Sequence, residues 1–310
     1  MMGSWDTVKE WLNSVYLCLY FWLESALRFC LPRRYYYKDL SDEIVLITGA
    51  ASGIGRDLAV ALADQVAHLV LWDINEAALN ETSKLVREMS AAKCTVFKLD
   101  ITDRQNVYRT AEQVRKSVGR VSVVVNNAGV VSGKPFLSLS DEEILRSFDV
   151  NVISNFWINK AFLPDMMAAN HGHIVTMATV ASFFGVPKLT DYSASKAAVY
   201  MLHETLACEM MALGLEGLKF TAICPFLVNT GMFSGAFSPL LRTLTSEEVV
   251  NKIIQAIKTD QFIMVIPRIV YFFLWIKQMI PATSGYFLLK LTGFLDLMTN
   301  FNGRLNGKAD

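Results

Sequence analysis

The stretch Thr48-Gly49-Ala50-Ala51-Ser52-Gly53-Ile54-Gly55 decides the fold. It follows an apolar run at 44–47 and precedes a helical pattern of apolar residues at 58–62, which predicts a strand, a glycine turn and a helix. The first glycine permits a tight turn, the second lets backbone amides approach a phosphate, and the third lets helix and strand pack closely. Because a helix N-terminus favours anions, the loop is expected to hold the diphosphate of a dinucleotide. An ordinary strand-to-helix turn can carry the same pattern.

Strand and helix patterns alternate along the rest of the chain. Apolar strands are predicted at 68–72, 95–100, 121–126, 173–177, 219–224 and 262–266. Capping-box sequences at 140–143 and 245–248 predict the starts of two helices. Such alternation implies a parallel sheet with helices on both faces. The predicted fold class is therefore α/β, a Rossmann-like doubly wound parallel sheet in a single domain, with an N-terminal hydrophobic membrane segment.

Asp73 ends the second predicted strand, about twenty residues after the glycine loop. A carboxylate at this position can accept hydrogen bonds from the adenosine ribose of a dinucleotide. It also repels a 2′-phosphate, and the loop itself contains no lysine or arginine. We therefore expect NAD as the preferred cofactor. Arg56, directly after the loop, leaves NADP open, and Asp73 as a solvated loop residue is the structural alternative.

A phenol and an ammonium lie one helical turn apart in Tyr192-Ser193-Ala194-Ser195-Lys196. Residues four apart share a helix face, so Lys196, together with a bound cationic nicotinamide, is expected to favour the phenolate and lower the pKa of Tyr192 from about 10 toward neutrality. A tyrosine with such a pKa is a usable general base. The pair alone is a weak signal, because both residues are common on amphipathic helices.

The motifs occur in an order that resembles the short-chain dehydrogenase/reductase family over about residues 40–260. Asp100, the run Asn126-Asn127-Ala128-Gly129 and Asn151 extend the match. The resemblance implies hydride transfer with a nicotinamide cofactor. It also implies that Asp100 contacts the adenine, that Asn126 supports the central strand, and that Asn151 organises a helix distortion and a proton-relaying water chain.

The same resemblance assigns the site residues, and the scattered cysteines have no metal-ligand spacing, so no metal is expected. The expected catalytic residues are Tyr192, Lys196, Asn151 and Thr179. The expected cofactor contacts are Thr48, Gly49, Ser52, Gly53, Ile54, Gly55, Asp73, Asp100, Asn126, Ala128, Gly129, Tyr192, Lys196 and Thr230.

Two positions depart from the family pattern. The family usually has a serine thirteen residues before the catalytic tyrosine, where this chain has Thr179. Threonine keeps the hydroxyl that would orient a substrate carbonyl but narrows the pocket, and Ser182 is a less favoured substitute. The family also commonly has Pro-Gly where this chain has Pro225-Phe226. Retained but slower chemistry is the hypothesis, and a binding scaffold with little turnover is the alternative.

The N-terminal segment carries no charge from 11 to 23 and stays mostly apolar to 31. A helix over 11–31 could span a bilayer if Glu24 and Arg28 pair, whereas the shorter run reaches only ~20 Å, so spanning and interfacial insertion both remain open. The basic and aromatic residues on its C-terminal side are expected to orient the enzyme toward the cytosol: Arg28, Arg33, Arg34, Tyr35, Tyr36, Tyr37 and Lys38.

Three segments are expected from these patterns. Residues 1–38 form a membrane anchor with a basic flank, 39–267 form the NAD(P)-binding domain, and 268–310 form an apolar C-terminal extension. That extension is expected to cover the substrate cleft or to lie on a membrane. Between cofactor site and extension, residues 231–237 are expected to form an apolar lid.

Composition limits the partners. The formal net charge of zero gives no broad basic field for nucleic acid, and five scattered cysteines suit a reducing compartment. The segments at 71–75, 160–164, 171–175 and 230–233 resemble the membrane-associated branch of retinol and 17-beta-hydroxysteroid dehydrogenases. This resemblance implies a lipophilic small-molecule substrate and residence at the endoplasmic reticulum membrane or lipid-droplet surface. A homodimer is left open.

Overall fold

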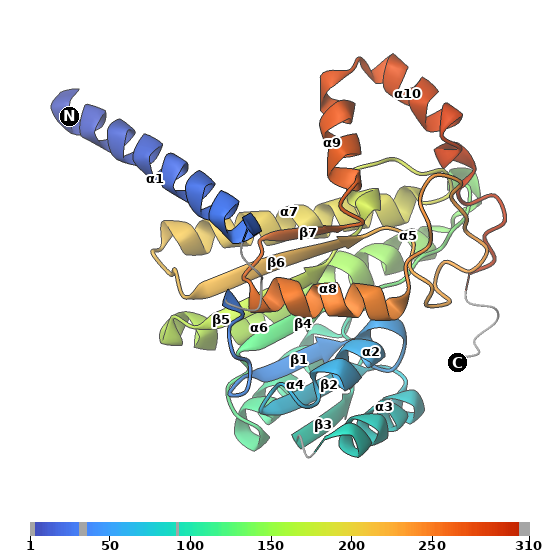
Figure 1. Cartoon of the computed structure of the whole chain (residues 1–310). Coiled ribbons are helices and arrows are strands. Elements are labelled where there is room, and N and C mark those ends of the chain that lie inside the picture. Colours follow the sequence, from blue (N-terminus) through green and yellow to red (C-terminus); the bar gives the residue numbers. More distant parts are fainter. Residues whose placement is uncertain (1–3, 31–35, 91–92, 304–310) are drawn as a thin grey trace. The chain divides into compact units, whose positions relative to one another are not determined.

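The computed structural model describes residues 4–30, 36–90 and 93–303. The chain divides into two units, Met1–Lys38 and Asp39–Asp310. The larger unit is built on a seven-stranded parallel sheet with the order β3-β2-β1-β4-β5-β6-β7 (Figure 1). The strands are β1 (Ile44–Thr48), β2 (His68–Asp73), β3 (Lys93–Lys98), β4 (Val123–Asn126), β5 (Gly172–Met177), β6 (Leu218–Pro225) and β7 (Ile263–Ile266). The predicted Rossmann-like parallel sheet is confirmed.

Helices cover both faces of the sheet (Figure 1). One layer contains α2 (Gly53–Leu62), α3 (Glu76–Met89) and α8 (Ser246–Lys258), and the other contains α4 (Arg104–Ser117), α6 (Ser154–Ala169) and α7 (Thr190–Ala212). Successive strand side chains point to opposite faces, so Val45 and Ile47 enter the first layer while Leu46 enters the second. The strand order reverses between β1 and β4, which opens a crevice at their carboxyl ends.

The two predicted capping boxes are present. Ser140 and Glu143 cap each other's backbone amides at the start of α5 (Asp141–Phe148), and Thr245 and Glu248 do the same for α8. Between α5 and α6 the chain forms a π-helical turn, Asp149–Ile153. The helix distortion expected at Asn151 is therefore present.

The N-terminal unit contains one helix, α1 (Ser4–Cys30). Its exposed apolar side chains include Trp11, Leu12, Leu19 and Trp22. Within the described part of the chain, no helix combines the length and the hydropathy needed to cross a bilayer. Three residues predicted to flank the membrane, Arg33, Arg34 and Tyr35, lie outside the described residues, as do the side chains of Glu24 and Arg28.

The C-terminal extension forms α9 (Val270–Met279) and α10 (Ala282–Leu291), which project from the β7 end of the sheet (Figure 1). Both helices expose large apolar side chains: Phe272, Trp275, Met279, Tyr286, Phe287 and Leu291. The chain then packs back on the domain, where Phe294, Leu297 and Met298 are buried. Lys188 Nζ donates to the Met298 carbonyl at 3.0 Å, which ties this return to the loop before α7.

The close approach of β1 and α2 predicts a specific intolerance at Gly55. A Cβ there would lie 2.2 Å from the Gly49 carbonyl oxygen and 2.5 Å from Asn127 Nδ2. We expect Gly55→Ala to lower the free energy of unfolding by about 1–3 kcal/mol, as overpacking does. Gly185→Ala is the matched control, since a Cβ at Gly185 meets nothing within 4 Å. The free energy of unfolding of Gly185→Ala should stay within about 0.5 kcal/mol of the wild-type value. Equal losses of stability in the two variants would contradict the predicted clash at Gly55.

Candidate active site

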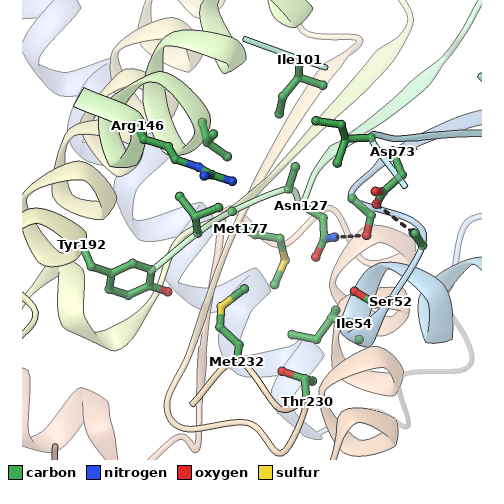
Figure 2. A pocket seen from close by; sticks show the side chains of 18 of the residues that line it. Ser52, Ile54, Asp73, Ile101, Asn127, Arg146, Met177, Tyr192, Thr230 and Met232 are labelled. Carbon is green, nitrogen blue, oxygen red and sulfur yellow. Dashed lines mark hydrogen bonds between the residues drawn. The ribbon is translucent and has the colours of Figure 1, made fainter. Parts of the chain in front are cut away.

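A cleft of about 920 Å³ lies at the carboxyl ends of the strands. Most of the residues expected from the sequence line it: Gly49, Ser52, Gly53, Ile54, Asp73, Asp100, Ala128, Gly129, Thr179, Tyr192, Lys196 and Thr230. Four of the expected residues are not among those that line it: Thr48, Gly55, Asn126 and Asn151. Figure 2 shows Asp73 and Ser52 at one side of this cleft and Tyr192 at the other.

The glycine loop is locked to the loop after β4. Thr48 Oγ1 accepts from the backbone amides of Asn127 at 3.0 Å and Ala128 at 3.2 Å. In return, Asn127 Nδ2 donates to the carbonyls of Thr48 at 2.9 Å and Gly49 at 3.2 Å. No sequence motif predicts this role of Asn127, although the residue belongs to the run 126–129 that resembles the family.

The N-terminus of α2 is suited to an anion. The first turn contains no acidic residue, and the side chain of Ser52 makes no capping hydrogen bond. Ser52, Gly53 and Ile54 line the cleft, so the first amides of the helix and its positive dipole end are directed at this space. A dinucleotide diphosphate fits such a terminus.

Asp73 holds the same loop and keeps capacity for a ligand. Its Oδ2 accepts from the Ala51 amide at 3.0 Å, and its Oδ1 accepts from the Asn75 amide at 2.9 Å. An ionised carboxylate has about four acceptor positions, so ribose hydroxyls can still bind there. Asp100 is arranged similarly, with Oδ1 accepting from the amide and the hydroxyl of Thr102 at 2.9 and 2.7 Å.

Tyr192 and Thr179 face one another in a buried position. Their exposed fractions are 5% and 8%. Burial raises the pKa of Tyr192 above its ordinary value, and the hydrogen bond with the Thr179 hydroxyl acts in the opposite direction. Thr179 Oγ1 also donates to the Pro225 carbonyl at 3.1 Å. The hydroxyl of Ser182 is used elsewhere, since it donates to the Lys196 carbonyl at 3.0 Å.

Lys196 lies one turn after Tyr192 with its ammonium bound to backbone. Nζ donates to the Met177 carbonyl at 2.7 Å and lies 5.9 Å from the centre of the Tyr192 ring. Burial lowers the pKa of Lys196 to about 8. Burial disfavours the charged forms of both side chains, so the lowering of the Tyr192 pKa by Lys196 together with a bound nicotinamide stays a prediction for the complex.

Asn151 joins three parts of the site from the π-helical turn. Its Oδ1 accepts from the Val130 amide at 2.9 Å, and its Nδ2 donates to the Val130 carbonyl at 3.0 Å and to Ser195 Oγ at 2.9 Å. Ser195 Oγ in turn donates to the Tyr192 carbonyl at 2.8 Å. A Cβ at Gly129 would lie 3.2 Å from Asn151 Oδ1 and 3.4 Å from Lys196 Nζ, so the glycine leaves room for both groups.

Asn126, Thr230 and Phe226 each contact a neighbouring segment of the domain. Asn126 Nδ2 donates to Asn159 Oδ1 at 2.9 Å, which joins β4 to α6. Thr230 packs against the glycine loop, because a Cβ at Gly53 would lie 3.3 Å from its Cβ. The ring of Phe226 packs on Phe294 with centroids 5.8 Å apart, so the C-terminal extension accommodates this departure from the family pattern.

The segment 231–237, expected as an apolar lid, is held by the end of the chain. Phe233 lies 5.5 Å from the Tyr192 ring and 6.4 Å from the Phe301 ring, centroid to centroid. Asn302 N donates to the Ser234 carbonyl at 2.9 Å, and Phe237 N donates to the Leu297 carbonyl at 3.0 Å. Phe233 and Phe226 thus form an aromatic wall of the cleft. Met232 also lines the cleft (Figure 2).

The lowered pKa of Lys196 makes the free energy of unfolding depend on pH. Between about pH 8 and the ordinary value of 10.5, the unfolded chain keeps a proton that the folded chain has lost. The free energy of unfolding therefore rises with pH in this window. In denaturant titrations, we expect the free energy of unfolding of wild type, minus that of Lys196→Met, to rise from pH 8 to pH 10. Lys160→Met, at an exposed position, is the control for losing one lysine. A difference that falls over this range would contradict the burial of the ammonium.

Comparisons with known proteins agree with the geometry. A family model described as short chain dehydrogenase matches residues 43–240. Short-chain dehydrogenase/reductase family 16C member 6 of Bos taurus is 45% identical over 267 residues, 85% of this chain and 84% of its own. Epidermal retinol dehydrogenase 2 of Mus musculus is 43% identical over 86% of this chain and 87% of its own. The 17-beta-hydroxysteroid dehydrogenase 13 of Homo sapiens is 40% identical over 91% of this chain and 93% of its own.

A solved structure supports the same assignment. A short-chain dehydrogenase/reductase from Burkholderia phymatum in complex with NAD superposes with a TM-score of 0.71 at 26% identity, over 78% of this chain and 95% of that one. The relatives bear the names of dehydrogenases, which does not favour a scaffold without turnover. The chain belongs to the short-chain dehydrogenase/reductase family, as a nicotinamide-dependent oxidoreductase.

Proposed function

We propose that this enzyme oxidises the hydroxyl of a lipophilic alcohol, retinol or a steroid, with NAD as the preferred cofactor. The observation that carries the proposal is the convergence of the Thr179 and Tyr192 hydroxyls beside an aromatic wall formed by Phe226 and Phe233. An apolar wall with a few polar groups is typical of a site that orients an apolar ligand by its hydroxyl. Relatives named for retinol and 17-beta-hydroxysteroids support this substrate class.

The residues divide the work of the reaction. Thr179 and Tyr192 would bind the substrate hydroxyl, and Tyr192 would take its proton as general base. The bound nicotinamide dinucleotide supplies the hydride acceptor. Lys196 would provide positive charge next to the phenolate, and Asn151, bound to Ser195, would hold the helices that carry the proton path. Reduction of the corresponding carbonyl uses the same groups in reverse.

The preference for NAD rests on Asp73. Its carboxylate is fixed by the Ala51 and Asn75 amides at the cleft wall, where a 2′-phosphate would meet a like charge. NADP remains the alternative cofactor, since Arg56 follows the glycine loop. The cellular direction of the reaction would follow the cofactor that is used.

We further propose attachment to the endoplasmic reticulum membrane or to lipid droplets, with the catalytic domain facing the cytosol. The exposed apolar side chains of α1 and the apolar surface of α9 and α10 support this proposal. Trp and Tyr side chains such as Trp275 and Tyr286 suit the interface between water and lipid. Attachment there would place the aromatic wall of the cleft close to a dissolved lipid alcohol. A homodimer stays open.

The assignment of Thr179 predicts a graded loss of turnover. Thr179→Val removes the hydroxyl at nearly constant shape, so kcat for retinol or a steroid should fall about 10²–10³-fold, the loss typical of removing one hydrogen-bonding group that stabilises the transition state. Thr179→Ser keeps the hydroxyl and should retain activity. NADH formation in membrane fractions measures both variants, with Tyr192→Phe as the inactive reference. Full activity in Thr179→Val would remove Thr179 from the mechanism, and no turnover of any lipid alcohol despite NADH binding would favour the scaffold.

Membrane attachment through the C-terminal helices is open to a flotation assay. In a chain lacking residues 1–38, Trp275→Asp combined with Phe287→Asp should lower the fraction bound to phospholipid vesicles, since charge opposes burial in lipid. Met89→Asp, at the end of α3, is the control because Met89 is 67% exposed and comparable to Trp275 at 62%. Equal binding of all three proteins would contradict a role of α9 and α10 in attachment.

A further inference from the structure

Arg146 is a cation of the cleft that belongs to none of the sequence motifs. It lies on α5, lines the cleft, and extends its guanidinium into it from the wall that also bears Tyr192 in the view of Figure 2. The glycine loop with Ser52 and Ile54 lies across the cleft from it in that view. A guanidinium in this position faces the space between the adenosine side and the Tyr192 side.

The guanidinium has no protein partner in the described part of the chain, although carboxylates lie within helical reach. Glu142 is four residues before Arg146 and Asp149 is three residues after it, and both spacings favour ion pairs. Glu142 is instead engaged at the helix start, where hydrogen bonds with its own backbone amide and with Ser140 lower its pKa. Arg115, by contrast, bonds to Asp165 at 2.7 Å.

The cleft is lined by more negative than positive side chains, although the dinucleotide that it would bind is itself negatively charged. Four lining residues are carboxylates, Asp73, Asp100, Glu142 and Asp149, and two are cations, Lys196 and Arg146. Lys196 is bound to the Met177 carbonyl and lies beside Tyr192. A diphosphate carries two negative charges, and the amides of α2 approach it from one side only. Of the two lining cations, Arg146 is therefore the one available to contact the opposite side of the diphosphate.

We propose that Arg146 binds the diphosphate of the nicotinamide dinucleotide, opposite the N-terminus of α2. A planar guanidinium offers paired donors that match phosphate oxygens, and its charge is kept at any physiological pH. The inference rests on the nicotinamide dependence of the enzyme and is independent of which alcohol it oxidises. Arg146 and the helix amides would thus hold the diphosphate from both sides, which fixes the dinucleotide along the cleft.

The test is a binding measurement on the full chain in detergent, without turnover. NADH and NADPH fluorescence titrations should give dissociation constants about tenfold higher for Arg146→Gln than for wild type, the loss expected for a charged hydrogen bond. Both dinucleotides should be affected alike, because both contain the diphosphate. Arg146→Lys should recover part of the affinity, and the difference should shrink as salt is raised. Arg120→Gln, outside the cleft on the segment before β4, is the control for losing one positive charge.

Competing ligands locate the contact. ADP-ribose contains the diphosphate and should lose affinity for Arg146→Gln, whereas adenosine lacks it and should not. Unchanged dinucleotide affinity would overturn the proposal, and so would a loss confined to NADPH, which would indicate the 2′-phosphate. If no lipid alcohol is oxidised but Arg146→Gln still weakens NADH binding, the proposed substrate fails while the role of Arg146 stands.

Discussion

The hydrogen bond from the buried Lys196 ammonium to the Met177 carbonyl is the interaction on which the site depends. The ammonium of Lys196, a residue that is only 5% exposed, must be hydrogen-bonded, because a buried charge without a partner is costly. The carbonyl it uses is at the end of β5, so the bond holds the first turns of α7 across the carboxyl edge of the sheet. Tyr192 lies on the same face one turn earlier, and its hydroxyl is thereby directed at Thr179.

The space around this bond is kept by glycines and shaped by asparagines. Gly129 leaves room for Lys196 and Asn151, and Gly55 allows α2 to approach the loop that receives the cofactor. Asn151 and Asn127 make the cross-links, the first to α7 through Ser195 and the second to β1. Both side-chain amides therefore hold neighbouring elements in place, and their loss would disturb the packing around the cleft.

The sequence predicted what local patterns encode. Alternating strands, two capping boxes and the distortion at Asn151 each have a short signature, and each is present. The return of the C-terminal extension has none, since contacts such as Phe233 with Phe301 join distant segments and depend on the finished fold. The burial that raises the pKa of Tyr192 could not be predicted for a related reason, because spacing gives the neighbour but not the degree of burial. Arg146 was not predicted because it belongs to no motif, and only the finished fold shows that its charge lines the cleft.

For Tyr192 to act as the base, positive charge in the cleft must overcome the cost of burying its phenolate. Ultraviolet difference titration of tyrosinate, wild type minus Tyr192→Phe, measures this directly with and without oxidised dinucleotide. Without the dinucleotide, the Tyr192 signal should appear only above pH 10, as burial dictates. With it bound, the cationic nicotinamide adds to the charge of Lys196, and the signal should move below about pH 9. A Tyr192 signal that stays above pH 10 in the complex would contradict its role as the base.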